Sequence, residues 1–156
     1  MKSSQTRYIS FITLLIGLLA TSMIFMPAIK FENYDTVYSG IEATFGVEIM
    51  NIGIASGQLN FSFWSFVAYG LPILAGLLAF SIKQGSFVSS LLFLISAVLL
   101  FTLPEYINSS ATFLGGTQDL EINCVMQYGL LISGSLSVLG TIVSLLQGVS
   151  QLKIDN

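Results

Sequence analysis

Four long apolar runs divide this sequence, and none of them contains Asp, Glu, Lys or Arg. They cover residues 8–29, 61–82, 86–103 and 124–147, so each holds between 18 and 24 residues. At a rise of about 1.5 Å per residue, helices of that length span roughly 27 to 36 Å, which matches a hydrocarbon core of about 30 Å. The pattern predicts four transmembrane helices and disfavours the alternative, which is a set of buried helices in a soluble core.

The first run has a second alternative, a cleaved signal peptide, because the basic residues Lys2 and Arg7 precede it. The apolar stretch from residue 9 to residue 26 is longer than the roughly 7 to 15 residues of a usual signal-peptide core. No A-x-A cleavage pattern follows it. We therefore expect a retained first helix.

Residues 36–52, TVYSGIEATFGVEIMNI, lie between the first two runs and show a different period. Apolar and polar residues alternate there, which is typical of a half-buried strand. The expected apolar face of this outer-cap strand carries Val37, Ile41, Phe45, Val47 and Ile49. The alternative is an apolar loop at the membrane interface, although a loop of 31 residues (30–60) without structure would be unusual. The predicted fold class is an all-α transmembrane four-helix bundle with a small extracellular β-sheet or hairpin in the first outer loop.

The composition agrees with this class, since 54% of the 156 residues are hydrophobic and only 8% are charged. Soluble domains usually carry about 25% charged residues, so a lipid bilayer must cover much of the surface. The net charge of −3 argues against a nucleic-acid partner, which requires clustered Lys and Arg.

The few basic residues predict the orientation. Four of the five lie on one side of the spans, namely Lys2, Arg7, Lys83 and Lys153, and only Lys30 lies on the other. By the positive-inside rule both termini and the turn 83–85 are cytoplasmic, and the outer loops are residues 30–60 and 104–123. We expect a single domain, residues 1–156, in the cell membrane.

Four spans, cytoplasmic termini and a strand-bearing first outer loop together resemble the claudin-like tetraspan architecture. The resemblance covers the topology of the whole chain. The claudin first loop carries a Gly-Leu-Trp element followed by two cysteines, whereas this chain has no Trp or Cys between residues 30 and 60. The chain is also similar to the small uncharacterised four-span proteins of bacterial membranes, and that resemblance implies no particular activity.

The sequence contains little that could carry chemistry. It has no His, its single cysteine is Cys124, and the four runs hold no ionisable group of the kind that proton relays and ion sites use. We find no Gly-rich phosphate loop, nucleophile elbow or metal cluster. The expectation is a non-enzymatic protein without catalytic residues, metal or cofactor.

Small and hydroxylated residues recur at helical spacing in the fourth run. They let helix backbones approach closely, and their hydroxyls can bond across helices. The expected helix-packing residues are Gly129, Ser133, Ser137, Gly140, Thr141 and Ser144 in this run and Gly76 in the second. Packing within the chain is the favoured interpretation, and the alternatives are a docking face for a membrane-protein partner or homo-oligomer, or a polar pathway.

Pro72 falls inside the second run, where it removes a backbone N–H and is expected to kink the helix. Neighbouring groups can satisfy the carbonyl that it frees.

Aromatic residues gather where the second run begins and the third ends. Such residues are typical of the membrane–water boundary, so we expect interface anchors at Phe61, Phe63, Trp64 and Tyr106.

These patterns predict a non-enzymatic multi-pass membrane protein that acts through protein–protein or envelope interactions. The alternatives are an accessory subunit of a transport complex, or a channel or exporter for small neutral solutes.

Overall fold

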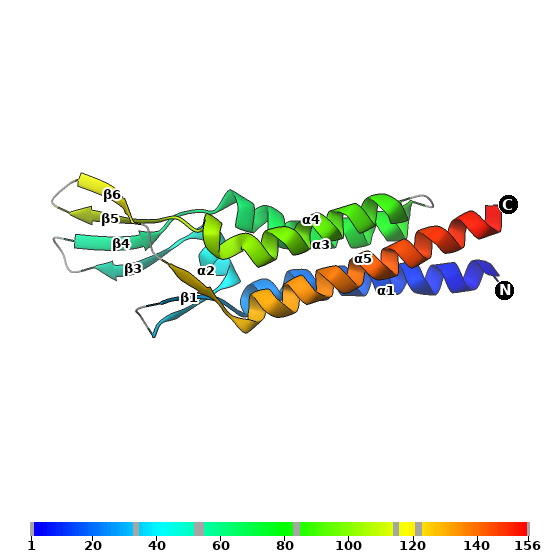
Figure 1. Cartoon of the computed structure of the whole chain (residues 1–156), viewed down its shortest axis with the longest axis horizontal. Helices are drawn as coiled ribbons and strands as arrows, with labels where there is room; N and C mark the ends of the chain where they lie inside the picture. Colours follow the sequence, from blue (N-terminus) through cyan, green and yellow to red (C-terminus); the bar gives the residue numbers. More distant parts are fainter. Residues whose placement is uncertain are drawn as a thin grey trace.

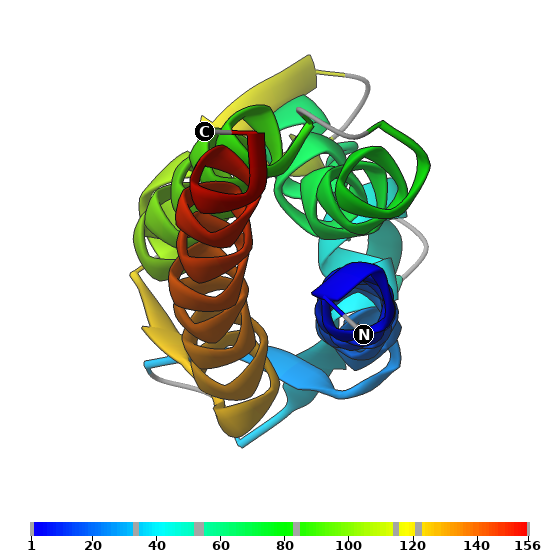
Figure 2. The ribbon, with the colours of Figure 1, turned by 90° about the vertical axis from the view of Figure 1, so that its right-hand side faces the viewer.

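Four long helices form the body of the protein in a computed structural model, which describes residues 2–32, 35–51, 55–82, 85–113, 116–120 and 123–155. They are α1 (Lys2–Ser22), α3 (Phe63–Ser81), α4 (Ser86–Thr102) and α5 (Tyr128–Asp155). Each packs against two neighbours in the order α1–α3–α4–α5, and we call this arrangement the helix ring (Figures 1 and 2). All four are long and apolar enough to cross a membrane, which confirms the prediction of four long apolar helices.

The first and last apolar runs are only partly helical. Helix α1 ends at Ser22, a 3-10 turn η1 (Met23–Phe25) follows, and strand β1 (Pro27–Phe31) begins at a proline that cannot donate a helical hydrogen bond. At the other end of the chain, Cys124–Met126 form strand β7 ahead of α5. Residues 27–29 and 124–126 are therefore extended, because β1 and β7 pair with each other: Ile29 lies opposite Met126 and Phe31 opposite Cys124.

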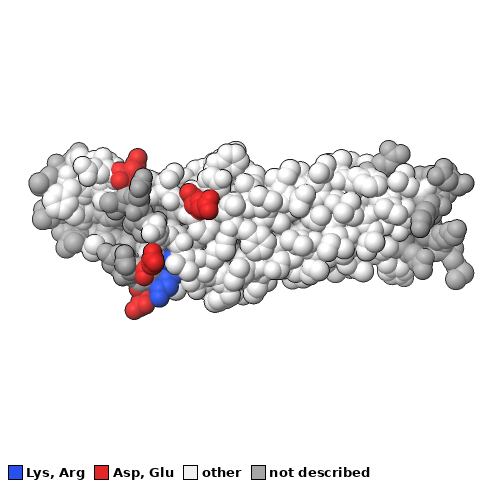
Figure 3. All heavy atoms as spheres, viewed as in Figure 1, with Lys and Arg blue, Asp and Glu red and all other residues white. Residues whose placement is uncertain are grey.

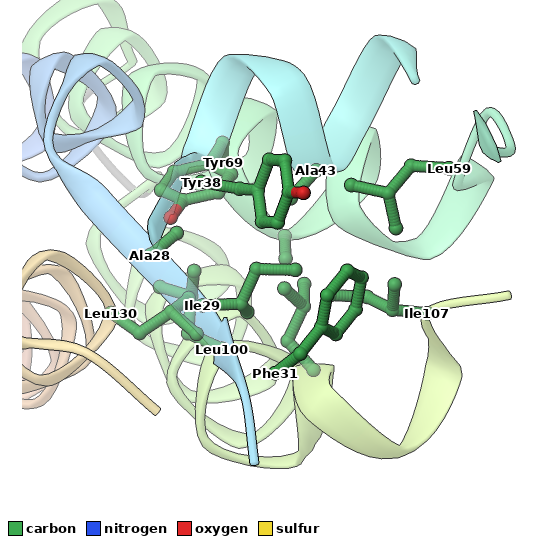
Figure 4. Packing of buried hydrophobic residues seen from close by; sticks show 12 residues of the cluster. Ala28, Ile29, Phe31, Tyr38, Ala43, Leu59, Tyr69, Leu100, Ile107 and Leu130 are labelled. Carbon is green, nitrogen blue, oxygen red and sulfur yellow. The ribbon is translucent and has the colours of Figure 1, made fainter. Parts of the chain in front are cut away.

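A three-stranded antiparallel sheet with the order β2-β1-β7 rests on one end of the helix ring, where β2 is Val37–Ser39. We call it the proximal sheet. A cluster of buried side chains joins it to the helices, with Ile29 and Phe31 from β1 facing Tyr69 of α3, Leu100 of α4 and Leu130 of α5 (Figure 4). A core of buried apolar side chains thus lies at this junction of helices and sheet.

A four-stranded antiparallel sheet with the order β3-β4-β5-β6 lies farther from the helices, and we call it the distal sheet (Figure 1). Its strands are β3 (Val47–Asn51), β4 (Ala55–Leu59), β5 (Ser109–Phe113) and β6 (Gly116–Leu120), and a short 3-10 helix η2 (Leu103–Tyr106) leads from α4 towards β5. The predicted sheet in the first loop is therefore half of a larger one, since β5 and β6 come from the segment between α4 and α5.

The prediction of one strand over residues 37–49 is wrong. Residues Gly40–Phe45 form a short helix, α2, between β2 and β3. It starts at a capping box, in which the Ser39 hydroxyl accepts from the Glu42 N–H and the Glu42 carboxylate accepts from the Ser39 N–H. It ends at Gly46, whose φ of 86° favours glycine.

Both termini lie at the end of the helix ring that is remote from the two sheets (Figure 1). On the face shown in Figure 3, the described charged side chains gather towards the sheet end, and none is seen over the middle of the four long helices. Residues 83 and 84 of the turn that we predicted to be cytoplasmic are outside the described residues.

Candidate functional site

The small-residue row of α5 faces the other helices of this chain. Ser133, Ser137 and Ser144 are fully buried, and a Cβ on Gly140 would lie 2.7 Å from the ring of Phe93 in α4. Gly134 meets Phe101, and Gly148 meets Phe87, in the same manner. The glycines meet the rings in opposite order along the two helices, as antiparallel neighbours require. Of the other predicted members, Gly129 packs against the carbonyl of Pro27, and Thr141 is half-buried.

Helices α1 and α3 approach through glycines as well. A Cβ on Gly17 of α1 would overlap the carbonyl oxygen of Pro72, and a Cβ on Gly76 of α3 would lie 3.0 Å from the Cα of Leu14. Any larger side chain at either position would push the two backbones apart. The predicted packing residue Gly76 therefore lies at a close backbone contact.

Hydroxyl groups inside the ring bond to backbone carbonyls of neighbouring helices. The Ser133 hydroxyl donates to Ala20 O of α1 at 2.8 Å, and the Ser144 hydroxyl donates to Ser86 O of α4 at 2.7 Å. The Ser137 hydroxyl donates to Ser133 O of its own helix at 3.0 Å and lies 3.4 Å from the Ser96 hydroxyl of α4. These polar groups are occupied by the chain itself, and so they act as contacts between helices.

A hydroxyl of a neighbouring helix serves the interruption at Pro72. Proline has no N–H for the carbonyl four residues earlier, which belongs to Ala68. The Ser96 hydroxyl of α4 donates to that oxygen at 2.7 Å, and the Thr21 hydroxyl of α1 donates to Tyr69 O at 2.9 Å. A neighbouring helix thus supplies a donor for the freed carbonyl of Ala68, as the sequence predicted.

Gln147 is fully buried in the helix ring, and its amide forms hydrogen bonds with two other helices. Its amide Nε2 donates to the Ser10 hydroxyl at 2.8 Å and to Ala79 O at 3.0 Å, and its Oε1 accepts from the Thr13 hydroxyl at 3.3 Å. One side chain of α5 thereby ties α1 to α3. Sequence reasoning missed this role, although an amide side chain in an apolar run is a visible signal.

The four predicted interface anchors are exposed and lie near one another. Trp64 contacts Phe63 and Tyr106 at ring-centroid distances of 5.9 and 6.3 Å, and Phe61 contacts Phe45 of α2 at 6.4 Å. All belong to the end of the helix ring nearest the sheets. Exposed aromatic residues at a helix end are typical of a membrane boundary, and their role as interface anchors stays a prediction.

The five residues assigned to one strand face divide between two environments. Val37, Ile41 and Phe45 are exposed, whereas Val47 and Ile49 of β3 pack against the junction core. Tyr38 of β2, which would lie on the opposite face of a single strand, is buried.

The distal sheet has two chemically distinct faces. Residues directly opposite one another share a face, so the pairs Met50–Gly57, Gly57–Ala111 and Ala55–Phe113 define one side. Of this face, the tip residues Met50 and Phe113 are 52% and 60% exposed, and a Cβ on Gly57 would meet nothing within 4 Å. We call Met50, Ala55, Gly57, Ala111 and Phe113 the apolar tip face, and Gln118 of β6, which lies opposite Ala111, borders it with an exposed amide. Hydroxyl, amide and carboxylate side chains occupy the other side: Glu48, Gln58, Ser56, Ser110, Thr112, Thr117 and Asp119.

Three side chains at the sheet end, those of Asp35, Tyr38 and Cys124, have shifted pKa values. The Lys30 ammonium donates to Asp35 at 2.8 Å, and this hydrogen bond and the charge of Lys30 lower the pKa of that carboxyl. Burial, followed by the negative charge of Glu42, raises the pKa of Tyr38. Burial also raises the pKa of the Cys124 thiol. Within the described part of the chain, no group of three or more Cys, Asp or Glu could hold a metal ion.

Four apolar helices of spanning length define a multi-pass helical membrane protein. The chain matches no protein-family model, no curated protein and no solved structure. The resemblance to tetraspan proteins therefore stays a prediction about topology.

Proposed function

We propose that this protein is a non-enzymatic four-span protein of the cell membrane that binds another protein of the membrane or envelope through the apolar tip face. In this proposal the four-helix bundle anchors the distal sheet outside the cell, and both termini are cytoplasmic. The exposure of the large apolar side chains of Met50 and Phe113 at the tip of this sheet is the observation that carries the proposal.

The chemistry of the apolar tip face supports protein binding. Met50 and Phe113 lie on either side of small residues, so their side chains border a shallow surface over Gly57. Exposed apolar patches with a polar surround are typical of protein interfaces, and Met and Phe are enriched in the centres of such interfaces. The sheet lies away from the helices, which leaves this face accessible to a partner beyond the membrane surface.

The interior of the helix ring supports anchoring in preference to transport. Phe93 fills the space over Gly140, and the buried hydroxyls of Ser96 and Ser133 are bonded to carbonyls of neighbouring helices. A solute pathway would need these groups to be free to bind solute.

Site-specific photo-crosslinking in intact cells tests the proposal. A photoreactive residue at Met50 or Phe113 should yield the same discrete protein adduct. The matched control is Thr117 on the opposite face, which should yield none of it. Equal adducts from both faces, or no adduct from the apolar tip face, would contradict the proposal.

A flux assay separates this function from transport. The purified protein in liposomes should pass no small neutral solute above the level of empty vesicles. A flux that changes with Ser137→Leu would place the protein among the channels or exporters instead.

A further inference from the structure

Helix α2 has its large apolar side chains on the outside. Ile41 and Phe45 are four residues apart, so they share one face of the helix, and they are 36% and 57% exposed. The opposite face carries Gly40, Ala43 and Thr44, which are all buried. A helix that borders water has the reverse pattern, with polar residues outward.

This small inner face fixes α2 against the start of α3. The Thr44 hydroxyl hydrogen-bonds the Ser65 hydroxyl at 2.8 Å, and the Ser62 N–H donates to Thr44 O at 3.0 Å. The ring of Phe45 then contacts the rings of Phe61 and Phe66, each at 6.4 Å. All three rings remain more than half exposed.

The same pattern continues along α3. Its buried side holds small residues such as Ser65 and Ala68, and its exposed side holds large apolar residues such as Leu74 and Phe80. The exposed side of a spanning helix contacts lipid, and Phe66 joins that side directly to Phe45. The one carboxylate of α2, on Glu42, is turned back to the Ser39 N–H and hydroxyl at the start of the helix.

We propose that α2 is an interfacial helix that lies in the membrane boundary at the sheet end, with Ile41 and Phe45 in contact with lipid acyl chains. Lipid is the occupant because this face is continuous with the lipid-facing side of α3. The neighbouring Trp64–Tyr106 pair is of the type that sits at headgroup level. The inference goes beyond the proposed function, since it holds whatever binds the distal sheet. The segment between α1 and α3 therefore returns to the membrane before it enters β3.

Tryptophan fluorescence in phosphatidylcholine vesicles tests this placement. The chain has a single tryptophan, so Trp64→Phe removes it and Phe45→Trp installs a reporter at an exposed position. Lipids brominated near the headgroup end of the acyl chain should quench the reporter strongly, and lipids brominated near the chain terminus should quench it less. Phe113→Trp in the same background is the control, because Phe113 is equally exposed but lies on the distal sheet. The emission of this control should lie at a longer wavelength than that of the reporter at position 45, and the brominated lipids should not quench it.

A second probe covers the case in which the tryptophan variant fails to fold. A nitroxide on Ile41→Cys in a Cys124→Ser background should collide with oxygen, which is enriched in lipid, more often than with a water-soluble nickel complex. The proposal would be overturned if the tryptophan at position 45 were not quenched by brominated lipid, or if the nitroxide at position 41 collided more often with the nickel complex than with oxygen. A reporter shielded from lipid and water alike would also overturn it, since that result would mean that polypeptide covers α2.

Discussion

The hydrogen bond from Ser96 to Ala68 O gives the sharpest stability prediction, because Pro72 makes it necessary. Ser96→Ala removes the donor and leaves a buried carbonyl without a partner. A hydrogen bond between membrane helices contributes about 0.6 kcal/mol on average and up to about 1.7 kcal/mol. A buried acceptor left unsatisfied costs about 1 to 3 kcal/mol. We therefore expect Ser96→Ala to lower the free energy of unfolding by about 1.5 kcal/mol.

The dependence on Pro72 can be isolated by a double-mutant cycle. In Pro72→Ala the new N–H can donate to Ala68 O within α3, so the Ser96 hydroxyl becomes dispensable. Ser96→Ala should then cost only about 0.5 kcal/mol, which gives a coupling energy of about 1 kcal/mol. Reversible unfolding in mixed detergent micelles, followed by circular dichroism, measures all four proteins.

Ser137→Ala is the matched control for this cycle. Its hydroxyl is equally buried, donates to Ser133 O of its own helix and lies 3.4 Å from the Ser96 hydroxyl, but it does not reach the carbonyl freed by Pro72. We therefore expect a loss of only a few tenths of a kcal/mol. An equal cost of Ser96→Ala with and without Pro72 would refute the role assigned to this bond.

Three further predictions concern single positions. Gly140→Leu should lower the unfolding temperature clearly, because the added side chain collides with Phe93. Gly70→Leu should be tolerated, because nothing lies within 4 Å of a Cβ there, and equal effects of the two substitutions would contradict the packing described. Glu42→Lys should lower the free energy of unfolding by about 1 kcal/mol, because it removes the capping box of α2. Glu48→Lys, on the exposed part of β3, should change that free energy little, and a larger loss from Glu48→Lys than from Glu42→Lys would show that α2 does not depend on its cap. The Asp35 carboxyl should titrate with a pKa below its ordinary value of 3.8 in an NMR experiment. Its small contribution to stability is therefore present above the unfolded-state pKa and is lost as the pH falls through the folded-state pKa. Lys30→Gln should move the titration midpoint of Asp35 back up, and an unchanged midpoint would exclude the ion pair in solution.

The four helices were predictable because an uncharged run of about 20 residues has few other structures available to it. Their ends were not, since Ile29 and Cys124 are as apolar as the helical residues beside them. Both belong to strands because β1 and β7 pair across most of the chain length. Local periodicity does not reveal which distant segment will supply that partner.

The error over residues 37–49 has a specific origin. Ile41 and Phe45 are four residues apart, a spacing that fits both the period of a strand and the face of a helix. The sequence did contain the deciding signal, because Ser39 and Glu42 form an S-x-x-E capping box before an apolar segment. The small residues of α5 were visible as a packing row, but nothing in the sequence paired Gly140 with Phe93.

Cysteine accessibility tests most directly whether the distal sheet and the chain termini lie on opposite sides of a membrane. In a Cys124→Ser background, Phe113→Cys on β5 should react with a membrane-impermeant maleimide in intact cells. Gln84→Cys, between α3 and α4 in the sequence, should react only after the cells are permeabilised. Labelling of position 84 in intact cells, or protection of position 113 until permeabilisation, would contradict the proposed topology and with it the role of the distal sheet.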